Sequence, residues 1–80
     1  MLPEGFDWRP YLNGPALYAR DRMLAVLSRL TDGWRIDFVL YRRSEFFASE
    51  ATAIRYVTAW ACKWETRIRK EVAAPVVLGW

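Results

Sequence analysis

The chain has 80 residues, of which 54% are hydrophobic and 16% aromatic, and its net charge is +3. This length predicts a single domain spanning residues 1–80, and the apolar content excludes an intrinsically disordered chain. The sequence contains no histidine and a single cysteine, Cys62, so it offers neither the commonest general base nor a zinc ligand set. It also lacks a Walker A loop and a dinucleotide-binding glycine motif. We therefore predict a protein that is not an enzyme and that holds no cofactor and no metal.

No segment predicts export or insertion into a membrane. The chain has no run of about 18 apolar residues, and residues 1–5 lack the basic and apolar regions of a signal peptide. A lone cysteine cannot form an internal disulfide, which fits a reducing compartment. These features predict a cytoplasmic protein without a membrane partner.

Residues 1–15 contain three prolines and two glycines, which interrupt helices and strands. The same segment contains the aromatic residues Phe6, Trp8 and Tyr11. We expect an irregular arm that these side chains, Trp8 above all, hold against the body of the protein.

Residues 16–47 predict an antiparallel β-meander of three to four strands. The expected strands are residues 16–19, 23–31, 34–41 and 45–47, joined by short polar turns. Residues 16–30 alone also fit a helix, but the following Asp32-Gly33 pair, typical of a type I′ hairpin turn, favours strands. This turn places Trp34 opposite Thr31, and Phe38 opposite Leu27.

Alternation along the hairpin gives the sheet two unequal faces. The face that we expect to receive a helix holds Met23, Ala25, Leu27, Trp34, Ile36, Phe38 and Leu40. The second face is more apolar than a solvated face requires, so either the N-terminal arm or a protein partner should cover it. Its candidate protein-interface residues are Leu24, Val26, Val39 and Tyr41.

Residues 49–72 predict one long helix, because apolar residues recur there at three- and four-residue steps. Ser49 is a good N-cap, and Glu65 with Arg69 forms a favourable i,i+4 pair. Trp64 lies at the centre of the apolar stripe, so we expect it to be buried between the helix and the sheet, as we expect of Phe38. The predicted fold is α+β, with one long C-terminal α-helix packed on a small antiparallel β-meander.

The net positive charge comes from the second half of the chain, in the helix and the turn before the last strand. Such side chains suit contacts with phosphate or with an acidic partner. The candidate contacts are Arg42, Arg43, Arg55, Lys63, Arg67 and Lys70. The alternative is an ordinary solvated helix face without a partner.

Residues 73–80 form an apolar tail after the helix, which Pro75 ends. The candidate protein-interface residues in this tail are Val77, Leu78 and Trp80. The tail either pairs with a sheet edge of its own chain, pairs with a second copy to make a homodimer, or frays.

Two resemblances accompany these features. The motif LPEGFDW at residues 2–8, with EA at 50–51 and RYVTAW at 55–60, resembles small uncharacterised proteins of proteobacteria and their phages, a family that implies no activity. The strands followed by FASEA at residues 47–51 and a helix are similar in topology to the AP2-like DNA-binding domains of phage integrases. The second resemblance implies a sheet that reads DNA and a helix packed behind it.

Three functions fit these observations. The first is a small regulator of phage or prophage type that binds another protein, which the half-apolar sheet face and the apolar tail favour. The second is a nucleic-acid-binding module that uses the basic side chains, and the third is a structural homodimer. Salt separates the first two, because phosphate binding weakens steeply with salt and an apolar interface does not.

Overall fold

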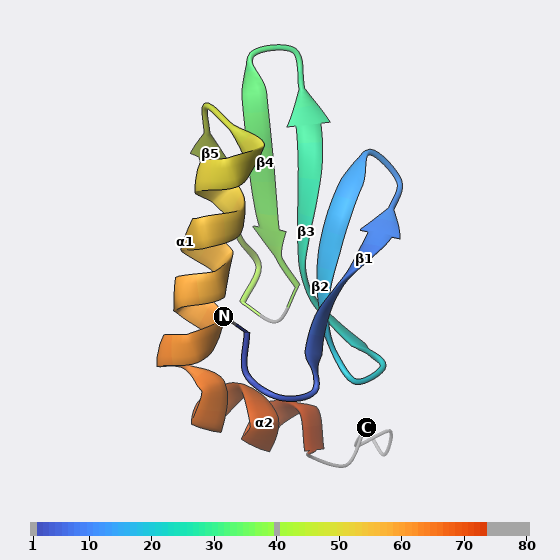
Figure 1. Cartoon of the computed structure of the whole chain (residues 1–80), viewed down its shortest axis with the longest axis vertical. Helices are drawn as coiled ribbons and strands as arrows, with labels where there is room; N and C mark the ends of the chain where they lie inside the picture. The colour runs from blue at the N-terminus through green and yellow to red at the C-terminus, as the bar shows by residue number, and fades with distance from the viewer. Residues whose placement is uncertain (1, 40, 74–80) are drawn as a thin grey trace.

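Five strands and two helices occupy the residues that the structure, a computed structural model, describes, namely 2–39 and 41–73. In chain order they are β1 (Phe6–Tyr11), β2 (Gly14–Ala19), β3 (Arg22–Leu30), β4 (Gly33–Phe38), β5 (Arg43–Phe47), α1 (Glu50–Lys63) and α2 (Glu65–Ala73). The strands form one antiparallel sheet in the order β1-β2-β3-β4-β5, with α1 lying along it and α2 crossing one end (Figure 1). The predicted α+β meander is confirmed. Its details differ, because the sheet has five strands and two helices replace the single long one.

The segment predicted as an irregular arm is a strand. β1 pairs with β2 along its whole length, with Trp8 opposite Leu17 and Pro10 opposite Pro15. The prolines are tolerated because β1 is an edge strand, and because Pro15 precedes the β2–β3 ladder, which begins at Ala16. The N-terminal segment therefore widens the sheet and does not cover its second face.

The β3–β4 hairpin is confirmed, but its predicted register is wrong by two residues. Leu27 pairs with Ile36 and Ala25 with Phe38. A shift of two residues keeps the side chains of the paired residues, 25–30 and 33–38, on their predicted faces. The turn consists of residues 31–32, and Gly33 is the first residue of β4. A Cβ at Gly33 would lie 2.5 Å from the Phe47 carbonyl oxygen, so the glycine permits the close approach of β5.

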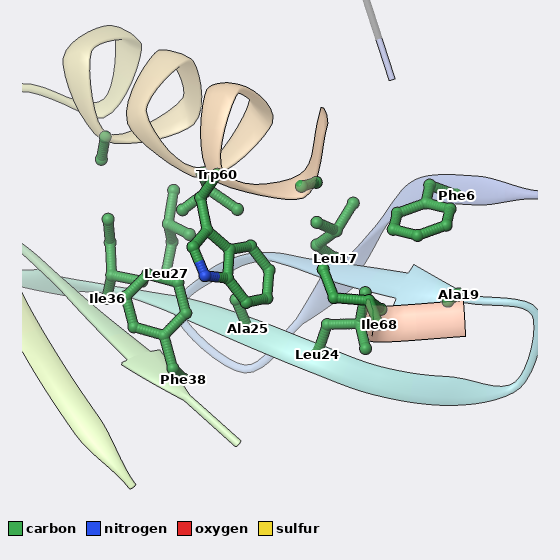
Figure 2. Packing of buried hydrophobic residues seen from close by; sticks show 13 residues of the cluster. Phe6, Leu17, Ala19, Leu24, Ala25, Leu27, Ile36, Phe38, Trp60 and Ile68 are labelled. Atoms are coloured by element: carbon green, nitrogen blue, oxygen red, sulfur yellow. The ribbon is translucent and has the colours of Figure 1, made fainter. Parts of the chain in front are cut away.

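One hydrophobic core lies between the sheet and the helices (Figure 2). The predicted burial of Phe38 is confirmed, and its ring centroid lies 4.8 Å from that of Trp60 on α1. The other main contributors are Leu17, Ala25, Leu27 and Ile36 from the sheet and Ala53, Val57, Ala61 and Ile68 from the helices.

Leu24 belongs to this core, which overturns its assignment to the second sheet face. The pairing of β2 with β3 shifts, since Leu17 pairs with Ala25 whereas Tyr18 pairs with Met23. Leu24 is the extra residue of this irregularity, and such a bulge re-aims a side chain. Leu24 and Ala25 are consequently both fully buried, and Leu24 belongs to the same hydrophobic cluster as Ile68 (Figure 2).

The predicted helix of residues 49–72 is broken at Trp64. The predicted cap is confirmed, because the Ser49 hydroxyl accepts a hydrogen bond from the Thr52 N–H at 3.2 Å. No proline or glycine lies between Ser49 and Ala73, so neither of the common helix-breaking residues causes the break. The change of direction lets Ile68 of α2 become fully buried at the end of the sheet. Without this change of direction, a straight helix over residues 49–72, about 36 Å long, would extend past the sheet.

Candidate binding surface

The break between the helices creates a small cleft on the protein surface. Tyr41, Arg43, Trp60, Trp64 and Arg67 line it, and its volume is about 240 Å³. Trp60 forms the buried wall, with its ring centroid 6.0 Å from that of Tyr41 in an edge-to-face arrangement. These five residues, with Lys63 beside them, are named here the Trp64 surface.

Trp64 is 41% exposed, so its predicted central burial is wrong. It is the C-cap of α1, where its N–H donates to the Trp60 carbonyl at 3.0 Å. Its own carbonyl accepts from the Ile68 N–H at 2.8 Å, and Ile68 occupies the core in its place. The helical periodicity predicted that Trp64 is buried because the prediction assumed a straight helix. A large exposed aromatic surface is the result.

Three cations of the Trp64 surface lie over aromatic rings. The Lys63 ammonium is 5.3 Å from the Trp64 ring centroid, and the Arg67 guanidinium carbon is 6.0 Å from that of Tyr41. The Arg43 guanidinium carbon is 4.9 Å from the Phe38 ring centroid. A cation–π contact holds a cation in place and leaves its positive charge intact.

Two of these cations also form ion pairs with carboxylates. Arg43 lies 3.6 Å from a Glu45 oxygen, and Arg67 lies 3.5 Å from a Glu71 oxygen, with all four side chains at least one third exposed. Exposed pairs at such distances contribute little to stability. They leave both guanidiniums with donors available for another acceptor.

Tyr41 adds a hydroxyl donor to the surface. Burial raises the pKa of its hydroxyl, and the Glu71 carboxylate adds to this rise while Arg67 opposes it. The group therefore stays protonated near neutral pH. Sequence alternation had assigned Tyr41 to the second sheet face, but the residue follows β4 and packs against Trp60 instead.

All six predicted cationic contact residues are exposed. The structure brings Arg43, Lys63 and Arg67 to the Trp64 surface, and Arg42 adjoins Arg43 in the turn before β5. Arg55 lies two turns before Lys63 on α1, and Lys70 lies on α2; neither lines the cleft.

The predicted protein interface does not assemble on the second sheet face. Leu24 is in the core, Val26 is half-buried and Val39 is exposed after β4. Val77, Leu78 and Trp80 lie outside the described residues. The described part of the chain thus provides no continuous apolar patch from the predicted set.

Charges on the second sheet face are paired with each other. Arg9 donates to Asp7 at 2.8 Å on β1, and Arg35 donates to Asp37 at 3.0 Å on β4. The Ser44 hydroxyl also donates to Asp37, at 2.6 Å. The Arg9 hydrogen bonds hold the pKa of Asp7 below its ordinary value. This face therefore offers little net positive charge to a nucleic acid.

The chemistry available at the Trp64 surface is recognition of a ligand. An exposed indole can stack on a planar group, while Arg43, Lys63 and Arg67 donate to oxyanions. Within residues 2–39 and 41–73, no group of three histidine, cysteine or acidic side chains could hold a metal ion. No helix of this part is long and apolar enough to span a membrane. Comparison with models of protein families, with curated proteins and with solved structures finds no match for this chain.

Proposed function

We propose that this protein is a small, non-enzymatic binding domain that holds single-stranded nucleic acid on the Trp64 surface. The observation that carries the proposal is an exposed tryptophan flanked by three cations, Arg43, Lys63 and Arg67. Proteins that bind single strands combine aromatic rings, on which bases stack, with basic groups that follow the phosphates. A duplex does not expose the faces of its bases in this way, so a single strand fits better.

The Trp64 surface supports this function better than the second sheet face does. Binding through the sheet, as the AP2-like topology implies, requires cations that are free to meet phosphates. Arg9 and Arg35 instead each meet a carboxylate on their own strand. Lys63 has an aromatic ring as its partner and no ion pair among the described residues.

The direct test is the affinity of a fluorescently labelled oligothymidine, measured by anisotropy at low salt. Replacing Trp64 by alanine removes the stacking platform and should weaken binding by about 1–3 kcal/mol. Phe46→Ala is the matched control, because Phe46 is also an exposed aromatic, at 67%, and lies on β5 outside the cleft. Equal affinities for both variants and the unaltered chain would reject stacking on Trp64.

Salt dependence provides the second readout. If about three phosphates meet Arg43, Lys63 and Arg67, the logarithm of affinity should fall with the logarithm of salt at a slope of roughly −2. The Lys63→Gln variant should reduce that slope by about 0.7, whereas Arg29→Gln, at an exposed cation outside the cleft, should not. A slope near zero would argue for an apolar interface.

The second candidate is a protein partner, and one observation favours it. Trp64, Tyr41 and Arg67 are residue types that dominate protein–protein interfaces. Phe46 is highly exposed on β5, a sheet edge that pairs with no further strand in the described part of the chain. A partner captured from lysate that survives nuclease and high salt, and that Trp64→Ala releases, would support this candidate. A doubled mass without any partner would indicate a homodimer.

A further inference from the structure

A separate cavity lies where the start of β1, the turn between β2 and β3, and α2 meet. Its volume is about 350 Å³, and none of its lining residues belongs to the Trp64 surface. Phe6, Ala19 and Val72 provide an apolar floor, and Arg20, Arg22 and Arg69 provide the cationic rim. The proposed nucleic-acid site makes no use of these residues.

The three guanidinium groups of the rim have N–H donors that are available to a ligand. Arg20 and Arg22 are exposed and make no ion pair within the described residues. Arg69 donates its Nε–H to Glu65 at 2.8 Å and an Nη–H to the Glu4 carbonyl, and it lies 5.2 Å from the Phe6 ring centroid. Its other Nη atom has no hydrogen-bond acceptor among the described residues. Asp21 is the one carboxylate among the lining residues, so the rim remains positive.

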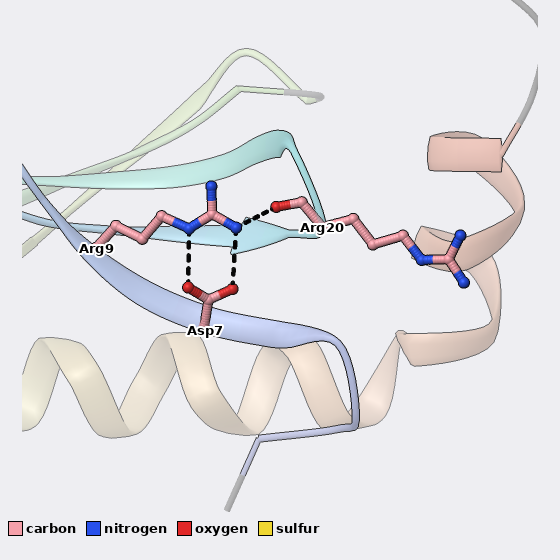
Figure 3. Close-up of polar contacts among 3 residues, drawn as sticks. All are labelled: Asp7, Arg9 and Arg20. Atoms are coloured by element: carbon pink, nitrogen blue, oxygen red, sulfur yellow. Dashed lines mark hydrogen bonds and ion pairs between the residues drawn. The ribbon is translucent and has the colours of Figure 1, made fainter.

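The turn that carries Arg20 is fixed by contacts from β1. Arg20 adopts a left-handed backbone conformation, with φ of 56°. The Arg20 N–H donates to the Gly5 carbonyl at 3.0 Å, and the Arg20 carbonyl accepts a hydrogen bond from Arg9. The Arg9 guanidinium also donates two hydrogen bonds to the Asp7 carboxylate, at 2.8 and 3.3 Å. Figure 3 shows the contacts of Arg9 with Asp7 and with the Arg20 carbonyl, and the Arg20 side chain extending away from them toward α2.

This hydrogen-bond network indicates a binding site whose geometry is set before the ligand binds. A left-handed non-glycine residue costs free energy and persists only where its surroundings determine it. Because Gly5 and Arg9 both hold the Arg20 backbone, the side chain starts from a fixed point beside α2. A site arranged before the ligand arrives loses less entropy on binding.

We propose that this cavity is a second binding site, which takes a small organic anion. Its oxyanion head, a phosphate or a carboxylate, accepts hydrogen bonds from Arg20, Arg22 and Arg69, since guanidinium matches such oxygens in geometry and charge. Its apolar body lies on Phe6, Ala19 and Val72. The volume is at the lower end of the range for small-molecule sites, so the body is about the size of one aromatic ring.

The test is a titration of the full chain with phenyl phosphate, followed by amide NMR. The expected result is a saturable set of shifts at Gly5, Phe6, residues 19–22, Arg69 and Val72. Inorganic phosphate and phenol each carry one half of the ligand, and both should bind at least about tenfold more weakly. Benzoate, with the same ring and a carboxylate head, identifies which oxyanion the site prefers.

The variant for this test is Arg20→Gln with Arg22→Gln, which keeps side-chain length and removes both charges. Its affinity for phenyl phosphate should fall at least about tenfold, because charge-assisted hydrogen bonds are the strong ones. Arg29→Gln, at the opposite end of β3, should leave the affinity unchanged. Shifts at Tyr41 and Trp64 instead, no saturation, or equal affinity of the double variant would overturn the proposal. Because the Trp64 surface is untouched, oligothymidine binding should survive in the double variant.

Discussion

The second sheet face and the Trp64 surface both carry arginines, yet their charges have different neighbours. On the sheet face, Arg9 and Arg35 each meet an aspartate two residues away on the same strand. On the Trp64 surface, Lys63, Arg67 and Arg43 lie over the rings of Trp64, Tyr41 and Phe38. On the sheet face both arginines donate hydrogen bonds to their aspartates. On the Trp64 surface, Arg43 and Arg67 form longer ion pairs, at 3.6 and 3.5 Å from Glu45 and Glu71, and Lys63 makes no ion pair among the described residues.

This difference shows why a count of basic residues is a poor guide to a binding site. Side chains two residues apart on a strand share a face, so an acidic residue at that spacing can pair with an arginine, as Asp37 does with Arg35 and Glu45 does with Arg43. The aromatic neighbour of a cation can come from another element, as with Tyr41 after β4 and Arg67 on α2, or from the next residue, as with Trp64 beside Lys63. The available charge is therefore set by the fold as much as by composition.

The largest expected effect is a difference in unfolding free energy between alanine variants of Trp60, on α1, and Trp64, the C-cap one turn later. Trp60→Ala should cost about 3–5 kcal/mol of unfolding free energy, because Trp60 is 9% exposed and packs on Phe38. Trp64→Ala should cost about 1 kcal/mol or less, since surface substitutions change stability little. Chemical denaturation measures both. Similar losses would mean that Trp64 is part of the core and would remove the central feature of the Trp64 surface.

The second effect compares how charge reversal on the Trp64 surface and on the sheet changes the affinity for oligothymidine. Reversing the charges of Lys63 and Arg67 together should weaken oligothymidine binding roughly tenfold or more at low salt, because two phosphate contacts are lost. Reversing Arg29 and Arg35 changes net charge equally and should alter affinity by no more than about twofold. Anisotropy titrations of both double variants give the comparison. The opposite ranking would transfer the proposed site to the sheet.

The smallest effect tests the charge pairing on the sheet face by its pH dependence. The pKa of Asp7 is lowered in the folded state because Arg9 donates to its carboxylate. A lowered pKa stabilises the fold above the unfolded-state pKa, and the contribution disappears as pH falls through the folded-state pKa. Asp7→Asn should therefore be slightly less stable than the unaltered chain near neutral pH, and equally stable in acid. Thermal melts across this range would contradict the account if the difference stayed constant.

Local patterns in the sequence predicted the features that depend on local structure. Ser49 caps α1, Glu65 pairs with Arg69 at 2.8 Å, and the β3–β4 hairpin has the predicted faces. The exposure of Arg55, Lys63, Arg67 and Lys70 followed from the helix pattern in the same way, and that of Arg42 and Arg43 from the predicted turn. Prolines misled the prediction for β1, because their tolerance depends on an edge position that the sequence does not reveal.

The remaining features depend on contacts between distant segments. The irregularity that buries Leu24 exists only in the pairing of β3 with β2. The break at Trp64 has no helix-breaking residue, and Ile68, one turn beyond it, is fully buried in the core. Since the Trp64 surface depends on that break, periodicity along one helix could not have found it. The only sign in the sequence was that Trp64 is adjacent to Lys63, and the apolar stripe predicted that Trp64 is buried.

The most direct measurement uses the tryptophan indole N–H signals in NMR while oligothymidine is added at low salt. The Trp64 signal can be assigned by its loss in Trp64→Ala. The account predicts that this signal shifts progressively and saturates, while the signals of Trp8 and Trp34, on β1 and β4, stay in place. An unmoved Trp64 signal, or shifts at Trp8 or Trp34 instead, would contradict the proposal that a single strand binds on the Trp64 surface.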